Sequence, residues 1–304
     1  MTLEQLRIFI EVAAREHLTR ASEVLNLTPS AVSSAIRNLE EHYGATLFNR
    51  IGRRIELTAD GQLFLEEARA TFARAQSAEQ MLSEMGGGKR GIVTIHASQT
   101  IASYWLPPYL ARFHAAHPMI QIRLTVGNTE SVTEATQKGL ADIGLVEGVV
   151  HASALSITQV GRDQLILVMR PEHPWSRGRE EKNLTWERLF EGQWITREQG
   201  SGTRSVFEDA LSAGGYDPER LNIALELPSN EAICSAVRSG DYVTVLSELV
   251  AMPHLAAGTL VKADFPLPQR QFLMLRRADR YQTKALQSFV DMIILTDPAA
   301  FPVR

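Results

Sequence analysis

Residues 21–50 read ASEVLNLTPSAVSSAIRNLEEHYGATLFNR, and this stretch decides the fold of the N-terminal part of the chain. Apolar residues recur at helical spacing on both sides of a break at Asn26–Leu27–Thr28–Pro29. Thr28 is a suitable N-cap, and Pro29 is a suitable first helical residue because that position needs no amide hydrogen. Two short helices joined by a tight turn predict a helix-turn-helix.

Three helical patterns surround this break. They cover residues 3–15, 18–25 and 29–42. In the first, Leu3, Leu6, Ile8, Phe9, Val12 and Ala13 recur at helical spacing; the expected inner residues of the other two are Ala21, Val24 and Leu25, and Ala31 or Val32, Ile36 and Leu39. We expect Thr19 to be the N-cap of the second helix. The outward face of the third helix carries Ser30, Ser33, Ser34 and Arg37. These short or forked hydrogen-bonding side chains suit base edges and phosphates.

The next stretch, TLFNRIGRRIELT at residues 46–58, has the pattern of a β-hairpin. Two apolar pairs flank a basic turn that contains Arg50, Arg53 and Arg54. A solvated turn is the simpler interpretation of these arginines. Their position directly after a helix-turn-helix favours a wing, a hairpin that contacts nucleic acid.

A single helical pattern then runs from Ala59 to Met85, with Thr58 as its expected cap. Its apolar positions alternate in three- and four-residue steps, apart from one glutamate: Leu65, Ala68, Phe72, Ala75, Glu79 and Leu82. This heptad seam predicts a dimerisation helix, because one helix cannot bury its own stripe. Packing against its own domain is the alternative. Gly86–Gly87–Gly88 predicts a flexible hinge after the helix.

From Ile92 onward, short apolar strands alternate with helices. Strands are expected at 92–96, 120–126, 142–146, 165–169, 194–196, 223–227, 242–246 and 271–275, and helices near 103–116, 130–139, 203–213, 230–239 and 281–295. Continuous apolar strands separated by helices predict a mostly parallel sheet covered on both faces. About 210 residues of this kind divide most naturally into two α/β lobes. Ligands in such folds bind beyond the carboxyl ends of the strands.

Composition limits the class of protein. The chain has 304 residues, 44% apolar residues, a net charge of −4 and one cysteine, Cys234. No apolar run is long enough for a transmembrane helix, and we expect a cytoplasmic protein without disulfides or membrane contact. Residues 1–58 contain seven arginines and seven glutamates and therefore carry no net charge with histidine neutral. Binding to nucleic acid must then come from the placement of charges.

The stretch LRIFIEVAAREHLTRASEVLNLTPSAVSSAIRNLEEHYGATLFNRIGRRIELTADG resembles the winged helix-turn-helix of LysR-type transcriptional regulators. The resemblance continues through "LP" at 106–107, "FHAAHP" at 113–118 and "GLADIGLV" at 139–146, and so covers the whole chain. It implies a DNA-binding domain at 1–58, a linker and dimerisation helix at 59–91, and a two-lobed effector-binding domain, similar to periplasmic binding proteins, at 92–304. Lobe I is expected at about 92–162 and 268–304, and lobe II at about 163–267.

The resemblance also implies partners. They are double-stranded promoter DNA, a second copy of the chain in a homodimer that pairs into a homotetramer, RNA polymerase and a small effector between the lobes. It places Pro29, Ser30, Ser33, Ser34 and Arg37 in the major groove, and Arg50, Arg53 and Arg54 along the phosphates or in the flanking minor groove. It implies no cofactor.

The stretch REQGSGTR at residues 197–204 predicts an anion site. It lies between a strand and the start of a helix, where free N–H groups and the positive end of the helix dipole attract anions. In the resembling family this segment lines the effector cleft. Side chains just past other strands should converge on it, giving the candidate effector residues Ser98, Gln99, Thr100, Thr129, Glu147, Gly200, Ser201, Gly202, Thr203, Arg204 and Asn230. A tight solvent turn is the simpler alternative.

This cup is rich in donors and poor in aromatic or apolar anchors, which suits a small oxyanion or a short phospho- or carboxy-acid. The segment EQGSGTR further resembles the subgroup that governs inorganic sulfur or carbon assimilation. We therefore expect a sulfur oxyanion such as sulfite or sulfate, with small organic or phosphorylated acids as the alternative.

Other classes of protein fit less well. A solute-binding protein would need a signal peptide and no DNA-binding head, and the sequence shows the reverse. An enzyme is not expected: GGGKRG at 86–91 lacks the Ser or Thr of a phosphate loop, and QGSGT lacks the spacing of a nucleophile elbow. His114 and His117 have no Cys or acidic partners for a metal site. Cys234 is expected to be an inert, packed thiol, with redox sensing as the alternative.

Overall fold

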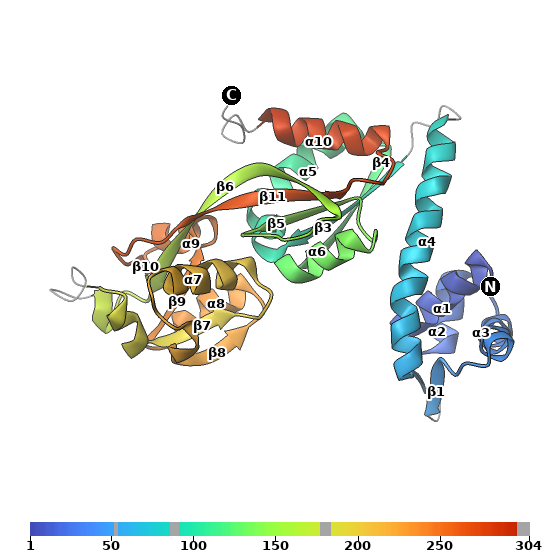
Figure 1. Ribbon diagram of the computed structural model, residues 1–304, viewed down its shortest axis with the longest axis horizontal. Helices are drawn as coiled ribbons and strands as arrows, with labels where there is room; N and C mark the ends of the chain where they lie inside the picture. The colour runs from blue at the N-terminus through green and yellow to red at the C-terminus, as the bar shows by residue number, and fades with distance from the viewer. Residues whose placement is uncertain (52–53, 86–90, 177–183, 297–304) are drawn as a thin grey trace. The chain divides into compact units, whose positions relative to one another are not determined.

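The computed structural model describes residues 1–51, 54–85, 91–176 and 184–296 (Figure 1). The chain divides into two compact units, Met1–Gly88 and Lys89–Arg304. Within the described ranges, no helix is long and apolar enough to cross a membrane. The hinge expected at Gly86–Gly88 lies outside the described residues and stays a prediction.

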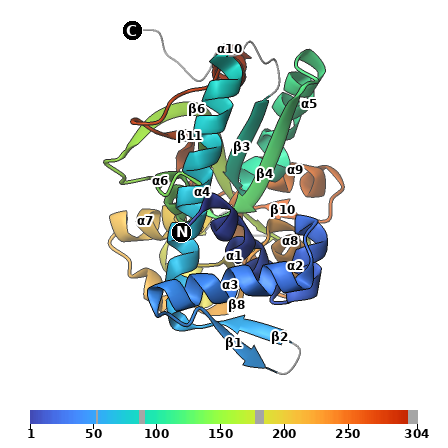
Figure 2. The same cartoon turned by 90° about the vertical axis from the view of Figure 1, so that its right-hand side faces the viewer.

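The first unit is a winged helix-turn-helix followed by a long helix. Its elements are α1 (Leu3–Arg15), α2 (Leu18–Leu25), α3 (Pro29–Tyr43), β1 (Phe48–Ile51), β2 (Arg54–Leu57) and α4 (Ala59–Met85). The Thr28 hydroxyl accepts from the Ala31 amide at 3.2 Å and caps α3 as expected, and Asn26 adopts a left-handed φ of 54° in the turn. The antiparallel strands β1 and β2 form the hairpin that extends beyond the helices in Figure 2.

Two details of α2 differ from the expectation. The helix begins at Leu18 with His17 as its N-cap and without a side-chain cap, so Thr19 lies inside the helix. Val24 is exposed, because α2 turns Ala21, Ser22 and Leu25 toward the core instead. A short amphipathic helix allows either neighbouring apolar residue on its inner face, and the packing on α1 and α3 selects one of them.

The apolar seam expected on α4 is buried near the start of the helix and exposed at Leu82. Ala68 is buried in the core of the first unit, and Phe64 and Leu65 pack against the same core. Leu82, near the other end of the seam, is exposed with 67% of its surface accessible. Packing on its own domain therefore accounts for the first part of α4, and a largely exposed apolar position, Leu82, lies further along.

The second unit contains one sheet and its helices. The strands are β3 (Gly91–Ser98), β4 (Ile120–Gly127), β5 (Ile143–Glu147), β6 (Leu155–Met169), β7 (Gln193–Arg197), β8 (Ile223–Leu227), β9 (Tyr242–Ser247), β10 (Val261–Lys262) and β11 (Gln269–Arg277). The helices are α5 (Pro107–Ala116), α6 (Thr129–Gln137), α7 (Gly202–Ala213), α8 (Asn230–Val237), α9 (Glu248–Ala256) and α10 (Lys284–Thr296), with short helical turns at Ile101–Trp105, Pro174–Ser176, Glu187–Glu191 and Pro218–Arg220.

The sheet has the strand order β4-β3-β5-β11-β6-β9-β7-β8. Strands β3, β4 and β5 are parallel, as are β7, β8 and β9, which agrees with the expectation of parallel pairing inside each lobe. The expectation was wrong for β6 and β11, which pair antiparallel with each other and with their neighbours. These two strands run between the lobes in opposite directions (Figure 1).

The strand β6 is longer than the apolar run 165–169 that predicts it. Its first part, which pairs with β11, contains polar residues such as Ser156, Gln159 and Arg162, and its last five residues pair with β9. We use lobe I and lobe II for the two parts of the sheet unit with the bounds given above. Lobe I has one large core cluster around Phe113, Phe272 and Phe289, and lobe II has two, which flank its strands.

Candidate functional site

The outward face of α3 is accessible. Pro29, Ser30, Ser34 and Arg37 are exposed, and Ser33 is half-buried. Among the residues that the structure describes, no hydrogen bond or ion pair holds the Arg37 guanidinium, so it is available to a base edge or phosphate. The five α3 residues expected to contact DNA thus lie on one face of this helix, opposite the buried Val32, Ile36 and Leu39.

The wing arginines are described only in part. Arg50 and Arg54 occupy the strands β1 and β2 next to the hairpin tip, where Arg54 pairs with Ile51. Arg53, and the side chains of Arg50 and Arg54, lie outside the described residues, so their contact with DNA stays a prediction.

The stretch at 197–204 forms the start of α7, as expected. Ser201 is the N-cap, and its hydroxyl accepts from the Thr203 amide at 3.3 Å. Gly200 has a φ of +82°, a left-handed conformation that favours glycine. A Cβ atom on Gly202 would lie within 3.0 Å of the Glu147 carbonyl oxygen and the Thr129 hydroxyl, so the first turn of α7 lies directly against the end of β5 and the start of α6.

Six of the expected effector residues form a buried cluster around this contact. Ser98, Thr100, Thr129, Ser201, Thr203 and Asn230 are each no more than 8% exposed. The first three belong to lobe I and the last three to lobe II. Asn230 Nδ2 donates to Thr100 Oγ1 at 3.1 Å, and Thr129 Oγ1 donates to the Glu147 carbonyl at 3.0 Å. We call these six residues the hydroxyl–amide cluster.

Two further buried groups give this cluster its charge. Glu147 ends β5, and its carboxylate accepts a hydrogen bond from the Ser98 hydroxyl. Arg270, on β11, donates from Nη1 to Thr203 Oγ1 at 2.9 Å and lies 3.5 Å from Glu147 Oε1. A buried guanidinium thus contacts both lobes at the cluster. Sequence reasoning missed Arg270, because nothing local in the stretch LPQRQFLML marks it as a site residue.

A second carboxylate holds Arg270 in place. Asp163, on β6, accepts from Arg270 Nε at 2.7 Å and from the Ser247 hydroxyl at 2.7 Å. Arg270 Nη2 lies equally close to Asp163 but outside hydrogen-bond geometry, so the Nε contact carries the pair. The ions in this network are two carboxylates and one guanidinium, all almost fully buried.

Arg204 lies elsewhere. Its guanidinium contacts Glu208, one turn later on α7, and Glu226 on β8. Burial tends to lower the pKa of Arg204, but the two carboxylates outweigh it and raise the pKa. The structure therefore places Arg270, rather than Arg204, at the hydroxyl–amide cluster. The assignment of Arg204 to the effector stays a prediction.

Hydrogen bonds close the two lobes onto each other beside the cluster. The Gln99 side chain donates to Glu231 Oε2 at 2.6 Å and accepts from the backbone amide of Asn230 at 3.2 Å. The Tyr104 hydroxyl donates to Glu231 Oε1 at 2.9 Å. Burial tends to raise the pKa of Glu231, but these hydrogen bonds and those of its own backbone lower it. A charged Glu231 is the stronger acceptor, so ionisation strengthens this cross-lobe contact.

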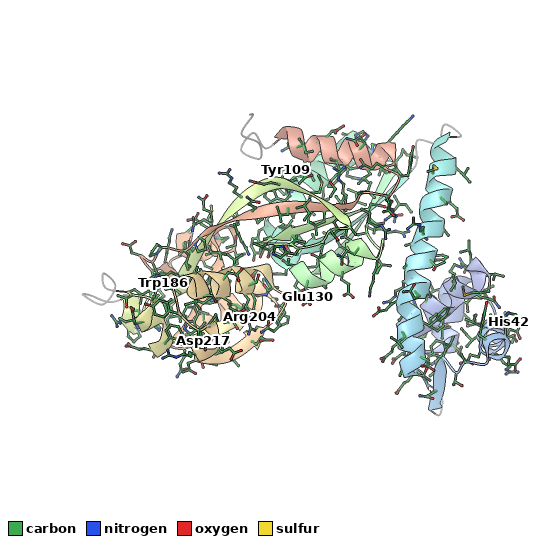
Figure 3. The ribbon with its side chains drawn as sticks, in the orientation of Figure 1. His42, Tyr109, Glu130, Trp186, Arg204 and Asp217 are labelled. Atoms are coloured by element: carbon green, nitrogen blue, oxygen red, sulfur yellow. The ribbon has the colours of Figure 1, made fainter. Side chains whose placement is uncertain are left out.

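A second contact joins the start of α6 to the loop before α7. The Glu130 amide donates to the Gly200 carbonyl at 3.1 Å, and Asn128 Nδ2 donates to Glu198 at 3.3 Å. Figure 3 labels Glu130 on α6 and Arg204 on α7, which mark the two lobes at this boundary. A groove of about 620 Å³ is lined by residues of both lobes, Arg270 among them.

Cys234 lies on α8 and is buried in a core cluster of lobe II. Burial, together with the charge of Glu231, raises the pKa of its thiol to about 11. The thiol therefore stays protonated near neutral pH, which supports the inert interpretation over a redox role. Among the described residues, His, Cys, Asp and Glu form no group of three able to hold a metal ion.

Comparison with known proteins identifies the family. The model "Bacterial regulatory helix-turn-helix protein, lysR family" matches residues 3–62, and the model "LysR substrate binding domain" matches residues 86–295. The chain belongs to the LysR family of transcriptional regulators. This result confirms the resemblance found in the sequence and the expectation that the chain is a regulator and not an enzyme.

Relatives of this LysR-type regulator align over most of its length. It is 36% identical to the uncharacterized HTH-type transcriptional regulator YeiE of Escherichia coli K12, over 99% of each chain. It is 32% identical to the HTH-type transcriptional regulator CysL of Bacillus subtilis, over 84% of this chain and 83% of the relative.

Solved structures of LysR regulators share the fold. Full-length CbnR, solved with its target DNA, aligns with a TM-score of 0.69 at 20% identity, over 96% of this chain and 99% of CbnR. The regulatory domain of CcmR from Synechocystis PCC6803, solved with 2-PG, aligns with a TM-score of 0.61 at 25% identity, over 68% of this chain and 97% of that domain.

Proposed function

We propose that this LysR-type regulator changes promoter binding and transcription in response to a small oxyanion that binds at the hydroxyl–amide cluster. The observation that carries the proposal is the convergence of six buried polar side chains and the Arg270 guanidinium at the start of α7. Neutral donors, a cation and a helix N-terminus together favour an anion. Because both lobes contribute, an occupant would change the free energy of lobe closure.

A sulfur oxyanion such as sulfite or sulfate is the effector that we favour. The cluster is small and fully polar, so it suits a compact inorganic anion better than a large apolar ligand. A small organic or phosphorylated acid is the alternative, and the 2-PG bound by the CcmR domain is the observation that favours it.

Thermal unfolding of the full-length protein tests the effector. We expect sulfite or sulfate at about 100 times its dissociation constant to stabilise the second unit by about 2.7 kcal/mol, which raises its Tm by about 5–10 °C. Ser98→Ala should abolish the shift, because the Ser98 hydroxyl lies in the cluster. Ser212→Ala, which removes an exposed hydroxyl at the other end of α7, should keep it. A shift with organic or phosphorylated acids alone would exclude the sulfur oxyanion.

The DNA-binding face is proposed to consist of Pro29, Ser30, Ser33, Ser34 and Arg37, with the wing arginines beside it. We expect Arg37→Ala to weaken binding to a cognate promoter by about 1–3 kcal/mol, or roughly tenfold to hundredfold, because it removes the longest and only charged side chain of this set on α3. Fluorescence anisotropy at fixed salt measures the change. Arg7→Ala, which removes the same charge from α1, is the matched control. Equal affinities of the two variants would remove Arg37 from the interface.

Self-association into a homodimer and a homotetramer is proposed from exposed apolar positions. The outermost strands β4 and β8 expose Leu124 and Val126, and Ile223 and Leu225. Leu82 is exposed on the seam of α4. Unpaired strand edges with apolar side chains invite pairing with another chain. RNA polymerase is a further proposed partner.

A further inference from the structure

The cluster that we propose for an anion already contains a carboxylate. Glu147 is 1% exposed, and its two oxygens face Ser98 on β3 and Arg270 on β11. The Ser98 hydroxyl, one of the donors expected to hold the effector, is thus engaged by Glu147. An anion that enters the cluster meets this carboxylate at short range.

The positive charge of Arg270 does not fully neutralise the negative charge of Glu147. Arg270 is shared between Glu147 and Asp163, and its closer contact is to Asp163, at 2.7 Å against 3.5 Å. Among the described residues, the other side-chain hydrogen bonds of these three groups are to the hydroxyls of Ser98, Thr203 and Ser247. With both carboxylates ionised, the network carries a net charge of −1. An anion at hydrogen-bond distance from the Glu147 carboxylate, away from water, would therefore be repelled strongly.

The backbone of Glu147 is restrained, so its carboxylate cannot easily move out of the cluster. Its carbonyl accepts from Thr129 and lies where a Cβ on Gly202 would clash, so its backbone is held between α6 and α7. A cationic effector would relieve the repulsion. However, the Arg270 guanidinium and the N-terminus of α7 face the same cluster and oppose a cation. An anion that carries a proton can donate a hydrogen bond to Glu147 while its negative charge faces Arg270 and the N-terminus of α7.

We propose that Glu147 makes the site selective for anions that bind with one proton between the anion and the Glu147 carboxylate. This inference rests on the proposed function. The proton comes with the ligand, or is transferred from solvent, which keeps the conjugate base; no other bond forms or breaks. Glu147 then accepts a hydrogen bond from a hydrogen oxyanion, while Ser98 and Arg270 contact its other oxygens. Hydrogen sulfite, hydrogen phosphate and phosphomonoesters belong to this class. Sulfate and nitrate, which carry no proton near neutral pH, do not, so this inference narrows the proposed sulfur oxyanion to sulfite.

Isothermal titration of the full-length protein tests this selectivity. Sodium sulfite, phosphate and sulfate are titrated, without oxygen, between about pH 6 and about pH 8, in pairs of buffers with different ionisation enthalpies. We expect sulfite to bind the wild-type protein with an affinity that falls by about tenfold per pH unit once it has lost its proton, with uptake of about one proton, whereas phosphate, which keeps at least one proton over this range, should bind without such a fall. Wild-type protein should bind sulfate at least about hundredfold more weakly than Glu147→Gln does.

The variant Glu147→Gln separates this proposal from the binding site itself. Its amide can donate to a fully ionised anion, so affinity should become independent of pH and sulfate should bind. Asp209→Asn removes one negative charge from the exposed face of α7 and should keep the wild-type pH dependence. If the wild-type protein binds sulfate as tightly as Glu147→Gln does, and this affinity does not depend on pH, the role of Glu147 is overturned and the anion site stays intact. Failure of all three anions to bind either protein, with both folded, would overturn the proposed effector site and this inference together.

Discussion

Arg270→Ala is expected to lower the free energy of unfolding of the second unit by about 3–5 kcal/mol, the largest effect of any single change considered for this protein. Arg270 is almost fully buried and is the cation of a network whose anions, Glu147 and Asp163, are equally buried. Removing it leaves two carboxylates together without a counter-charge. The cost arises mainly from these uncompensated charges and less from the lost attraction.

Chemical denaturation followed by tryptophan fluorescence measures this loss, because all four tryptophans, Trp105, Trp175, Trp186 and Trp194, belong to the core clusters of the second unit or pack against them. Arg277→Ala is the matched control: Arg277 lies on the same strand, but its partner Asp279 is exposed, and surface pairs contribute only about 0–1 kcal/mol. A loss equal to that of Arg277→Ala would show that the buried network does not need its cation.

A further variant tests the origin of the cost. Glu147→Gln combined with Asp163→Asn and Arg270→Met removes the three charges together. We expect this triple variant to be more stable than Arg270→Ala, because buried ion networks can be replaced by uncharged groups of similar volume at little cost.

The first unit could be predicted almost completely, because its signals are local. Thr28, Pro29 and the helical spacing after them specify α3, and the capping hydroxyl of Thr28 is found where the sequence places it. The error at Val24 has the same origin: one turn of an amphipathic helix does not decide between neighbouring apolar residues, and packing against other helices does.

The site in the second unit could be predicted only as far as it depends on the ends of parallel strands. Ser98 and Thr129 lie at or just past the carboxyl ends of β3 and β4 in lobe I, and Thr203 and Asn230 follow β7 and β8 in lobe II. Their positions at strand ends are a property of the fold. Arg270 enters on an antiparallel strand, 67 residues after Thr203 and 107 after Asp163, and no periodicity connects them. The sequence suggests Arg204 only because it is adjacent to Thr203. The helix, however, directs it toward Glu208, one turn away.

Gly202→Val is expected to abolish effector binding and to destabilise the second unit by about 1–3 kcal/mol through overpacking. A Cβ at this position would meet the Glu147 carbonyl oxygen, which is backbone, and the Thr129 hydroxyl, so α7 must move away from β5 and α6. That movement separates Ser201 and Thr203 from Ser98 and Thr129, and the cluster no longer has both of its halves.

Thermal shift with the oxyanion panel and promoter binding by anisotropy together measure the effect of Gly202→Val. Binding of operator DNA without effector should persist, because the first unit has its own core. Gly214→Ala, at the other end of α7, is the control, since its Cβ would meet a neighbour no closer than 3.2 Å, the Tyr216 ring. Retention of the full thermal shift by Gly202→Val would show that the effector does not bind where α7 contacts β5, and would leave the regulator without its proposed sensing site. Loss of the shift in Gly202→Val alone would instead establish that close contact between the lobes is required for sensing.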